Sequence, residues 1–179
     1  MAFTLDQVEQ YLKEMGFKFE RDNEKDAVLT GVSGDGQSAM IFIRAQENGE
    51  MFSLNMEPVN SDSSTPFDIP LDHPHLSLAL KKLLLINFQS KFGTWAYDMR
   101  DGDLRFSVGF PIQDSTLTKK QFERAMSIIF NALSEQNMLK KILETGKLPE
   151  EKIEIPADMA AQFEAFLRAQ AAKGTDDGI

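Results

Sequence analysis

The sequence contains no cysteine among its 179 residues. This absence excludes disulfide bonds, cysteine nucleophiles and zinc sites built on thiolates. Tryptophan and tyrosine are also scarce, with 1 and 2 copies, whereas phenylalanine and methionine have 14 and 9. Phe and Met are bulky and adaptable, so the apolar residues suit a packed core and also surfaces that accept several partners.

Basic residues are in the minority, because Lys and Arg total 19 against 28 Asp and Glu, for a net charge of −9. Nucleic acids and anionic membranes both attract basic surfaces, so neither is an expected partner. The longest apolar run, residues 39–43, is far shorter than the roughly 20 residues of a membrane span. No basic segment followed by an apolar one opens the chain, so we expect no signal peptide and a cytoplasmic protein.

Two helix starts of the same kind are present near the two ends of a central region. Thr4 with Gln7, and Thr118 with Gln121, each have the three-residue spacing of a capping box. Apolar residues recur at helical spacing after both starts. We predict an N-terminal helix that ends at about Gly16 and a long helix that begins after Thr118 and ends at Gly146.

Alternating apolar and polar residues between these helices predict strands. The expected strands cover residues 27–33, 38–46, 51–59, 94–100 and 104–111, with a short extended piece around Phe17 and Phe19. Asn48-Gly49 and Asp101-Gly102 are typical tight-turn pairs, and Gly34-Asp35-Gly36 is a third turn. The first three strands should form an antiparallel meander, and the last two a hairpin.

A middle helix is expected over residues 76–92, with Pro74 just inside it and Asp72 or His73 as its cap. Gly93 would end it. This helix is apolar on nearly every face, which predicts that it is covered on more than one side.

The strand pattern predicts an α+β fold, an antiparallel β-sheet with helices packed on one face, in the order α-β-β-β-α-β-β-α. This domain covers residues 1–146. Residues 147–179 are expected to hold a linker, a short amphipathic helix over 157–173 and a disordered tail. The apolar stripe of that helix either packs on its own domain or docks on a partner. The stripe consists of Met159, Phe163, Phe166 and Leu167.

An ordered set of motifs over residues 1–145 resembles the YbjN family. The motifs are Leu84-Leu85-Ile86-Asn87, Lys91-Phe92-Gly93-Thr94-Trp95, Asp101-Gly102-Asp103-Leu104-Arg105, and Phe110-Pro111 ahead of Leu117-Thr118. The family is described as sensory-transduction regulators and is similar in fold to the type III secretion chaperones. Those chaperones are homodimers that bind extended client segments without ATP, and their middle helix and the next strand build the dimer contact.

The resemblance therefore implies a homodimer, with this chain's middle helix and following strand at the contact. The candidate dimer-interface residues are Leu78, Leu85, Phe88, Trp95 and Tyr97. Met40 and Phe42 lie on the strand face opposite Ile41 and Ile43. They are candidates for partner binding as an exposed apolar patch, although a one-residue shift of strand register would explain them equally well.

Candidate catalytic or metal-binding groups are few. His73 and His75 beside Asp72 could ligate a metal, but a role in starting the helix explains them better, because no further ligand is evident. The glycines of residues 31–36 lie between two strands and fit a hairpin turn rather than a phosphate-binding loop. The aspartates of residues 98–103 likewise fit a solvated turn rather than a calcium loop. We predict no cofactor and no metal.

The sequence thus favours a non-catalytic protein-binding module, chaperone-like or regulatory, that acts as a homodimer. An alternative is a regulatory adaptor whose C-terminal helix binds the partner. A third, less favoured alternative is a cryptic enzyme, which would require a polar cleft around His73 or His75.

Overall fold

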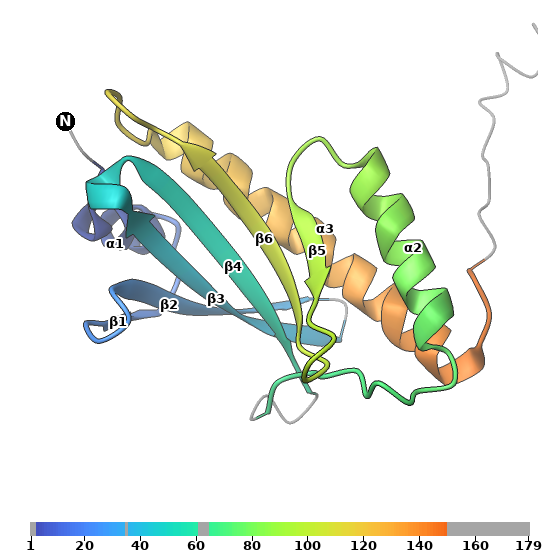
Figure 1. Cartoon of the computed structure of the whole chain (residues 1–179). Coiled ribbons are helices and arrows are strands. Elements are labelled where there is room, and N and C mark those ends of the chain that lie inside the picture. Colours follow the sequence, from blue (N-terminus) through green and yellow to red (C-terminus); the bar gives the residue numbers. More distant parts are fainter. Residues whose placement is uncertain (1–2, 35, 61–64, 150–179) are drawn as a thin grey trace, which may run out of the picture. The chain divides into compact units, whose positions relative to one another are not determined.

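The computed structural model of the chain describes residues 3–34, 36–60 and 65–149. Its elements, shown in Figure 1, are α1 (Leu5–Glu14), β1 (Phe19–Asp22), β2 (Ala27–Gly34), β3 (Gln37–Gln46), the short 3-10 turn η1 (Glu47–Gly49), β4 (Met51–Val59), α2 (Leu76–Gln89), β5 (Thr94–Tyr97), β6 (Leu104–Pro111) and α3 (Lys119–Thr145). This confirms the predicted fold class and element order, and the extended piece at Phe19 is an added edge strand. The helix expected over 157–173 lies outside the described residues.

The six strands of the described residues form one antiparallel sheet in the order β1-β2-β3-β4-β6-β5. The first four strands make a continuous meander. The second hairpin joins that meander through its second strand, because β6 pairs with β4, as in the register Met56–Phe106. β5 is therefore the last strand at that edge, and it pairs only with β6.

The core lies on one face of the sheet, under α1 and α3 (Figure 1). Ile41 and Ile43 of β3 are fully buried there, while Met40 and Phe42 lie on the opposite face and are half-buried. The register prediction for β3 is thus confirmed. No helix of the described residues covers the opposite face, which we call the open face.

Local hydrogen bonds explain why α1 and α3 begin where the sequence predicts. The hydroxyl of Thr4 accepts the backbone N–H of Gln7 at 3.4 Å, and Thr118 accepts that of Gln121 at 3.3 Å. In turn, the side-chain oxygen of each glutamine accepts the backbone N–H of the cap residue, so both capping boxes are complete. α3 ends at Gly146, which takes the left-handed conformation with φ of 64°.

The start of α2 differs from the prediction. His75 occupies the cap position, with no hydrogen bond from its side chain, so Pro74 lies before the helix rather than inside it. Neither Asp72 nor His73 caps the helix. The ring nitrogen Nδ1 of His73 instead accepts the N–H of His75 at 3.1 Å, which places that bond ahead of the first helical residue.

The end of α2 also comes earlier than expected, at Gln89 instead of residue 92. Ser90 has an extended backbone, and its hydroxyl donates to the carbonyl of Phe92 at 2.6 Å. Gly93 then turns the chain into β5 with φ of +86°. A Cβ at Gly93 would lie 2.2 Å from the ring of Phe106, so only glycine fits this turn.

None of the three helices in the described ranges combines the length and the apolar character needed to cross a bilayer.

Candidate functional site

α2 carries a row of exposed apolar side chains that continues into the loop after the helix. This surface, which we call the α2 stripe, consists of Leu84, Leu85, Phe88 and Phe92, with exposed fractions of 67%, 41%, 88% and 61%. Only Ala79 and Leu83 of this helix are buried. The described chain therefore covers α2 on one side. Coverage on a second side stays a prediction, because a second molecule would have to supply it.

The inner side of α2 is held to β5 by a pair of side-chain hydrogen bonds. The amide of Asn87 donates to the carbonyl of Trp95 at 2.9 Å and accepts its N–H at 2.8 Å. The indole N–H of Trp95 donates to the carboxylate of Glu135 in α3 at 2.6 Å. Burial raises the pKa of Glu135, although the bond from Trp95 works in the opposite direction. These bonds fix which face of α2 points outward.

The five dimer candidates from the sequence divide between surface and core. Leu85 and Phe88 lie on the α2 stripe. Leu78 and Tyr97 are half-buried against the core. Trp95 is only 3% exposed, and its ring packs inside the chain. The dimer contact itself stays a prediction, and Leu85 and Phe88 are the candidates that a second molecule could reach.

A second apolar surface lies where β6, α3 and the loop before β5 meet. This hollow, the β6 groove, has a volume of about 860 Å³. Its apolar floor consists of Phe92, Val108, Phe110, Ala125 and Ile128. Its polar rim consists of Thr118, Lys120, Gln121, Glu123 and Arg124. Phe92 belongs to both the α2 stripe and the β6 groove.

The sequence did not indicate the β6 groove. The alternation of β6 correctly predicts that Val108 and Phe110 face the core side of the sheet. The groove exists because β5 begins at Thr94, opposite Ser107, so that no strand of the described chain flanks residues 108–111 of β6 on that side. The early end of α2, which places Phe92 in a loop, was the missed signal.

The open face carries the sequence candidates Met40 and Phe42. The ring of Phe42 lies 5.6 Å from Lys25 Nζ and 5.6 Å from the guanidinium of Arg44. These cations cover the aromatic face, so the patch is less apolar than the sequence indicated. Partner binding at Met40 and Phe42 stays a prediction, and the candidates Met159, Phe163, Phe166 and Leu167 lie outside the described residues.

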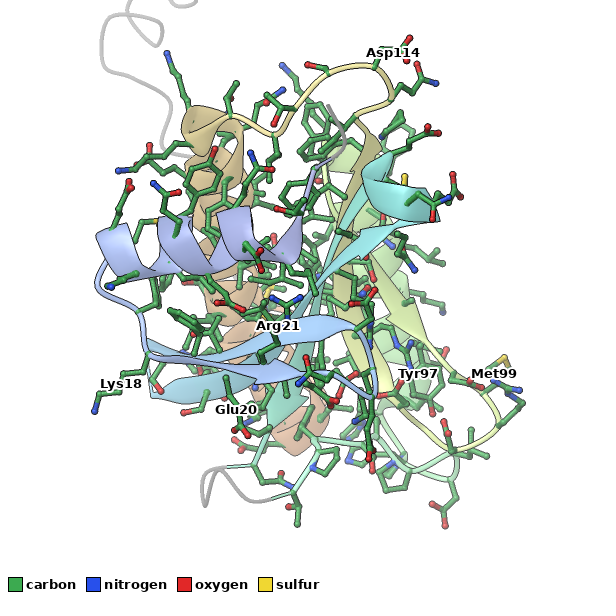
Figure 2. The ribbon with its side chains drawn as sticks, turned by 90° about the vertical axis from the view of Figure 1, so that its left-hand side faces the viewer. Lys18, Glu20, Arg21, Tyr97, Met99 and Asp114 are labelled. Carbon is green, nitrogen blue, oxygen red and sulfur yellow. The ribbon has the colours of Figure 1, made fainter. Side chains whose placement is uncertain are left out.

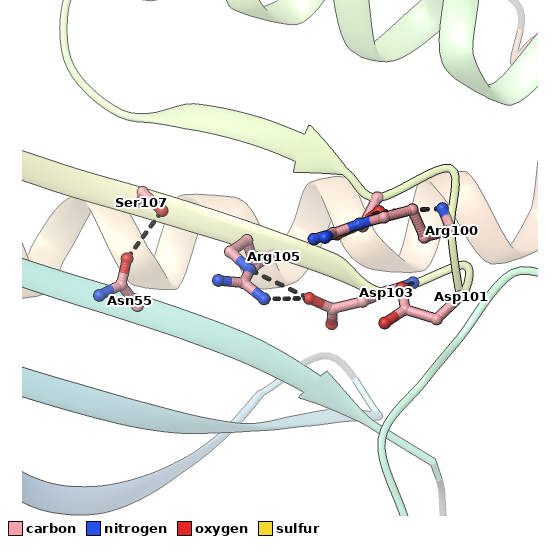
Figure 3. A network of polar contacts seen from close by, with 7 residues as sticks. Asn55, Arg100, Asp101, Asp103, Arg105 and Ser107 are labelled. Atoms are coloured by element: carbon pink, nitrogen blue, oxygen red, sulfur yellow. Dashed lines mark hydrogen bonds and ion pairs between the residues drawn. The ribbon is translucent and has the colours of Figure 1, made fainter. Parts of the chain in front are cut away.

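Polar side chains of β4, β6 and the turn before β6 bond to one another on the open face (Figure 3). Ser107 donates to Asn55 across β6 and β4 at 2.8 Å, and Arg105 pairs with Asp103. Partial burial raises the pKa of Glu57, which lies near Arg105, although the charge of Arg105 opposes the shift. This part of the face is occupied by internal polar contacts rather than by an apolar docking surface.

The aspartates of the β5–β6 turn bond within the turn. Asp98 accepts the backbone N–H and the guanidinium of Arg100, which lowers the pKa of Asp98 to about 2. Asp101 accepts the N–H of Asp103 at 3.1 Å. Met99 projects from this turn away from the sheet (Figure 2) and is 74% exposed. The geometry is that of a solvated hairpin, as the sequence predicts.

The two histidines lie side by side, with ring centroids 5.9 Å apart. In the part of the chain that the structure describes, no three His, Asp or Glu residues are grouped as a metal site would require. Residues 31–34 and 37 belong to a regular hairpin between β2 and β3, closed by the pair Gly34–Gln37, which confirms the hairpin prediction. Neither feature provides a pair of groups positioned for acid–base or nucleophilic chemistry.

Comparison with known proteins adds one positive result. The sequence model of the YbjN family, described as "Putative bacterial sensory transduction regulator", matches residues 4–135. This range includes α1, all six strands, α2 and the half of α3 that lines the β6 groove. No curated protein matches the sequence.

Proposed function

The chain belongs to the YbjN family, and from this premise we propose that it is a non-catalytic regulator that binds other proteins and acts as a homodimer. The α2 stripe is the observation that carries the proposal. A net charge of −9 supports a protein partner over a nucleic acid. The likeness of the fold to type III secretion chaperones, inferred from the sequence, supports the same mode of action.

The exposed area of the α2 stripe is large enough to support association. Full burial of one large apolar side chain contributes roughly 1.5–3 kcal/mol. By their exposed fractions, the stripes of the two copies together amount to about five such side chains, so they contribute roughly 8–15 kcal/mol. Association costs roughly 4–15 kcal/mol in lost freedom of motion. The two ranges overlap, and we therefore expect a dimer that dissociates on dilution.

A second copy of the chain fits the α2 stripe well. An apolar row without charged members is self-complementary, and a two-fold axis across it would bring Phe88 of each copy against the other. Lys81, one turn before Leu84, is exposed at the end of the row, and a two-fold antiparallel arrangement keeps the two lysines at opposite ends.

The test is the mass of the full chain in solution, measured by light scattering over a range of concentrations. We expect a dimer that Phe88→Asp converts to a soluble monomer. The matched control is Met99→Asp, since Met99 is also largely exposed (74%) but lies on the β5–β6 turn, and it should remain a dimer. A well-folded Phe88→Asp with the mass of a dimer would exclude α2 as the contact.

A second candidate function is that of a regulatory adaptor whose C-terminal segment binds the partner. Its support is the helical spacing of Met159, Phe163, Phe166 and Leu167. The full chain and a 1–146 variant, each tagged and recovered from the native cell, distinguish the two functions. A specific partner retained by both supports binding by the core, and a partner lost with residues 147–179 supports the adaptor.

A further inference from the structure

We propose that the β6 groove binds an extended segment of a partner protein, which pairs with the free edge of β6 as an added strand and carries apolar residues at alternate positions with acidic residues between or beside them. This proposal rests on the proposed function in one respect, that the chain binds proteins. It concerns a surface that shares only Phe92 with the α2 stripe, and it can fail independently of the dimer.

The first supporting observation is an unpaired stretch of strand. β5 begins at Thr94, opposite Ser107, so residues 108–111 of β6 have β4 on one side and no strand of the described chain on the other. In Figure 1 the upper half of β6 has β4 beside it, whereas β5 accompanies only its lower half. A strand edge of this kind is a template for another chain.

The direction of the main-chain groups follows from the alternation of an antiparallel strand. Asp103 accepts the N–H of Asp98 on the β5 side, while Ile112 donates to Glu50 on the β4 side. Odd-numbered residues of β6 therefore point their N–H and C=O groups toward the β5 side. At the free edge these groups are the N–H and C=O of Gly109 and the C=O of Pro111.

No strand of the described residues occupies the position beside 108–111, because the segment before β5 is turned away from it. Residues 90–93 would lie opposite 108–111 if β5 continued toward its N-terminal end. Gly93, with φ of +86°, instead turns this segment away, and the bond from Ser90 to Phe92 holds the resulting loop. The loop forms the far wall of the groove, and Phe92 is 61% exposed there.

The floor of the groove matches the side chains of an added strand. Val108 and Phe110 point to the α3 side of the sheet, so alternate residues of a neighbouring strand would point the same way. They would meet Ala125 and Ile128 of α3 and the ring of Phe92. Side chains in a mainly apolar pocket next to main-chain pairing are the two components of strand-addition recognition.

The dimensions also match. The four residues of the free edge span about 13 Å at roughly 3.3 Å per residue. The stretch from Thr118, the cap of α3, to Ile128 lines the groove and spans about 15 Å at 1.5 Å per residue. A strand of four or five residues would fill this length and bury two apolar side chains.

The charge of the rim indicates the polar residues of the partner. Lys120 and Arg124 lie on the rim with Glu123, and both Lys91 and Glu135 line the small hollow next to Phe92. The rim is thus locally positive on a chain whose net charge is −9. An acidic segment would be attracted to this part of the surface and repelled by most of the rest.

A helix would leave the groups of Gly109 and Pro111 without partners, so an extended segment fits better.

The experiment uses a phage-displayed library of random octapeptides selected against the full chain, and the best peptide is then synthesised with a fluorescent label. We expect alternating apolar residues with at least one Asp or Glu. Arg124→Glu should weaken its binding at least tenfold, while Lys141→Glu, the same charge change on an exposed part of α3 outside the groove, should change it less than threefold. Ile128→Glu should abolish binding, with Phe130→Glu on another face of α3 as its control.

Backbone methylation of the peptide tests strand pairing without changing the protein. Two versions of the peptide carry methyl groups on alternate backbone nitrogens, one on the odd-numbered and one on the even-numbered residues. The version that methylates the N–H groups facing β6 should not bind, and the other should bind normally. Equal binding of both versions, or selected peptides with apolar residues at helical spacing, would overturn the strand mode. A library that yields no peptide sensitive to Arg124→Glu would overturn the site. A change of oligomeric mass with Ile128→Glu would instead make the groove a contact between copies and also overturn the proposal.

Failure here is distinguishable from failure of the dimer, because Phe88→Asp should alter the mass and leave the affinity of the labelled peptide unchanged within threefold. If Phe88→Asp has the mass of a monomer and still binds the peptide, the α2 stripe and the β6 groove have separate roles.

Discussion

α2 and α3 are both rich in apolar residues, but the fold uses them differently. α3 buries ten of its 27 residues and has a capping box at its start and a left-handed glycine at its end. α2 buries two of its 14 residues, and no side chain caps its start. The apolar content of a helix therefore does not tell where the core is. The apolar residues of α3 stabilise the monomer, and those that α2 leaves exposed are available to a partner.

The largest difference should appear when the same side chain is removed from each helix. Phe122 of α3 is fully buried against Phe52 and Tyr11, and Phe122→Ala should lower the free energy of unfolding by roughly 3–5 kcal/mol. Phe88→Ala in α2 should lower it by less than about 0.5 kcal/mol, because that ring is 88% exposed. Urea denaturation measures both losses when the protein concentration is below the dissociation constant of the dimer, so that only the monomer unfolds. Equal losses would remove the distinction between the helices.

Two neighbouring leucines of α2 sharpen the comparison within one helix. Leu83 is buried and Leu84 is 67% exposed. Leu83→Ala should cost about 2–4 kcal/mol of monomer stability, while Leu84→Ala should leave it within about 0.5 kcal/mol and raise the dissociation constant of the dimer. Denaturation and sedimentation of the same samples report the two effects separately. A Leu84→Ala variant that unfolds as easily as Leu83→Ala would place Leu84 in the core.

The contribution of the α3 cap should be smaller. Thr118→Ala removes the acceptor for the N–H of Gln121 and should cost about 1 kcal/mol. Thr118→Ser keeps the hydroxyl and serves as the control, with a change of less than about 0.5 kcal/mol. Thermal unfolding at one concentration measures both variants. If serine proved as harmful as alanine, the methyl group of Thr118 and not its hydroxyl would be important.

The smallest effect concerns the carboxylate that joins α3 to β5. Because burial raises the pKa of Glu135 in the folded state, folding takes up a proton between the unfolded and folded pKa values. This contribution to stability is complete below the unfolded pKa and is lost as the pH rises through the folded pKa. Glu135→Gln keeps an acceptor for the indole of Trp95, so it should flatten the stability profile above the ordinary carboxyl range. Unfolding free energies from pH 4 to 8 measure this, and a steeper decline in the variant would reverse the sign.

The sequence predicted well those features that depend on neighbours in the chain. The caps at Thr4 and Thr118, the end of α3 at Gly146 and the register of β3 all rest on contacts within a few residues or on simple alternation. The predicted start and end of α2 were wrong because of equally local hydrogen bonds. His73 accepts the N–H of His75 and the hydroxyl of Ser90 donates to the carbonyl of Phe92, and composition does not reveal either bond.

The candidate sites were less predictable. Alternation grouped Trp95 and Tyr97 on one face of β5 but could not say that this face is the inner one. That orientation depends on the hydrogen bonds of Trp95 to Asn87 of α2 and to Glu135 of α3. Glu135 is 40 residues away in the sequence. Phe88 and Leu85 were identified because the resemblance to the secretion chaperones implies a dimer contact on the middle helix, and because that helix has more apolar surface than one core needs.

The sequence by itself determined the α+β class, the order of the elements, the two capped helices and the surplus of apolar residues on α2, because each follows from local hydrogen bonds or from side-chain periodicity. Only the tertiary structure decided that β6 rather than β5 pairs with β4, which side of α2 stays exposed, and that residues 108–111 keep a free edge above an apolar groove. These features depend on pairing between segments far apart in the chain, and a local pattern is compatible with several such pairings.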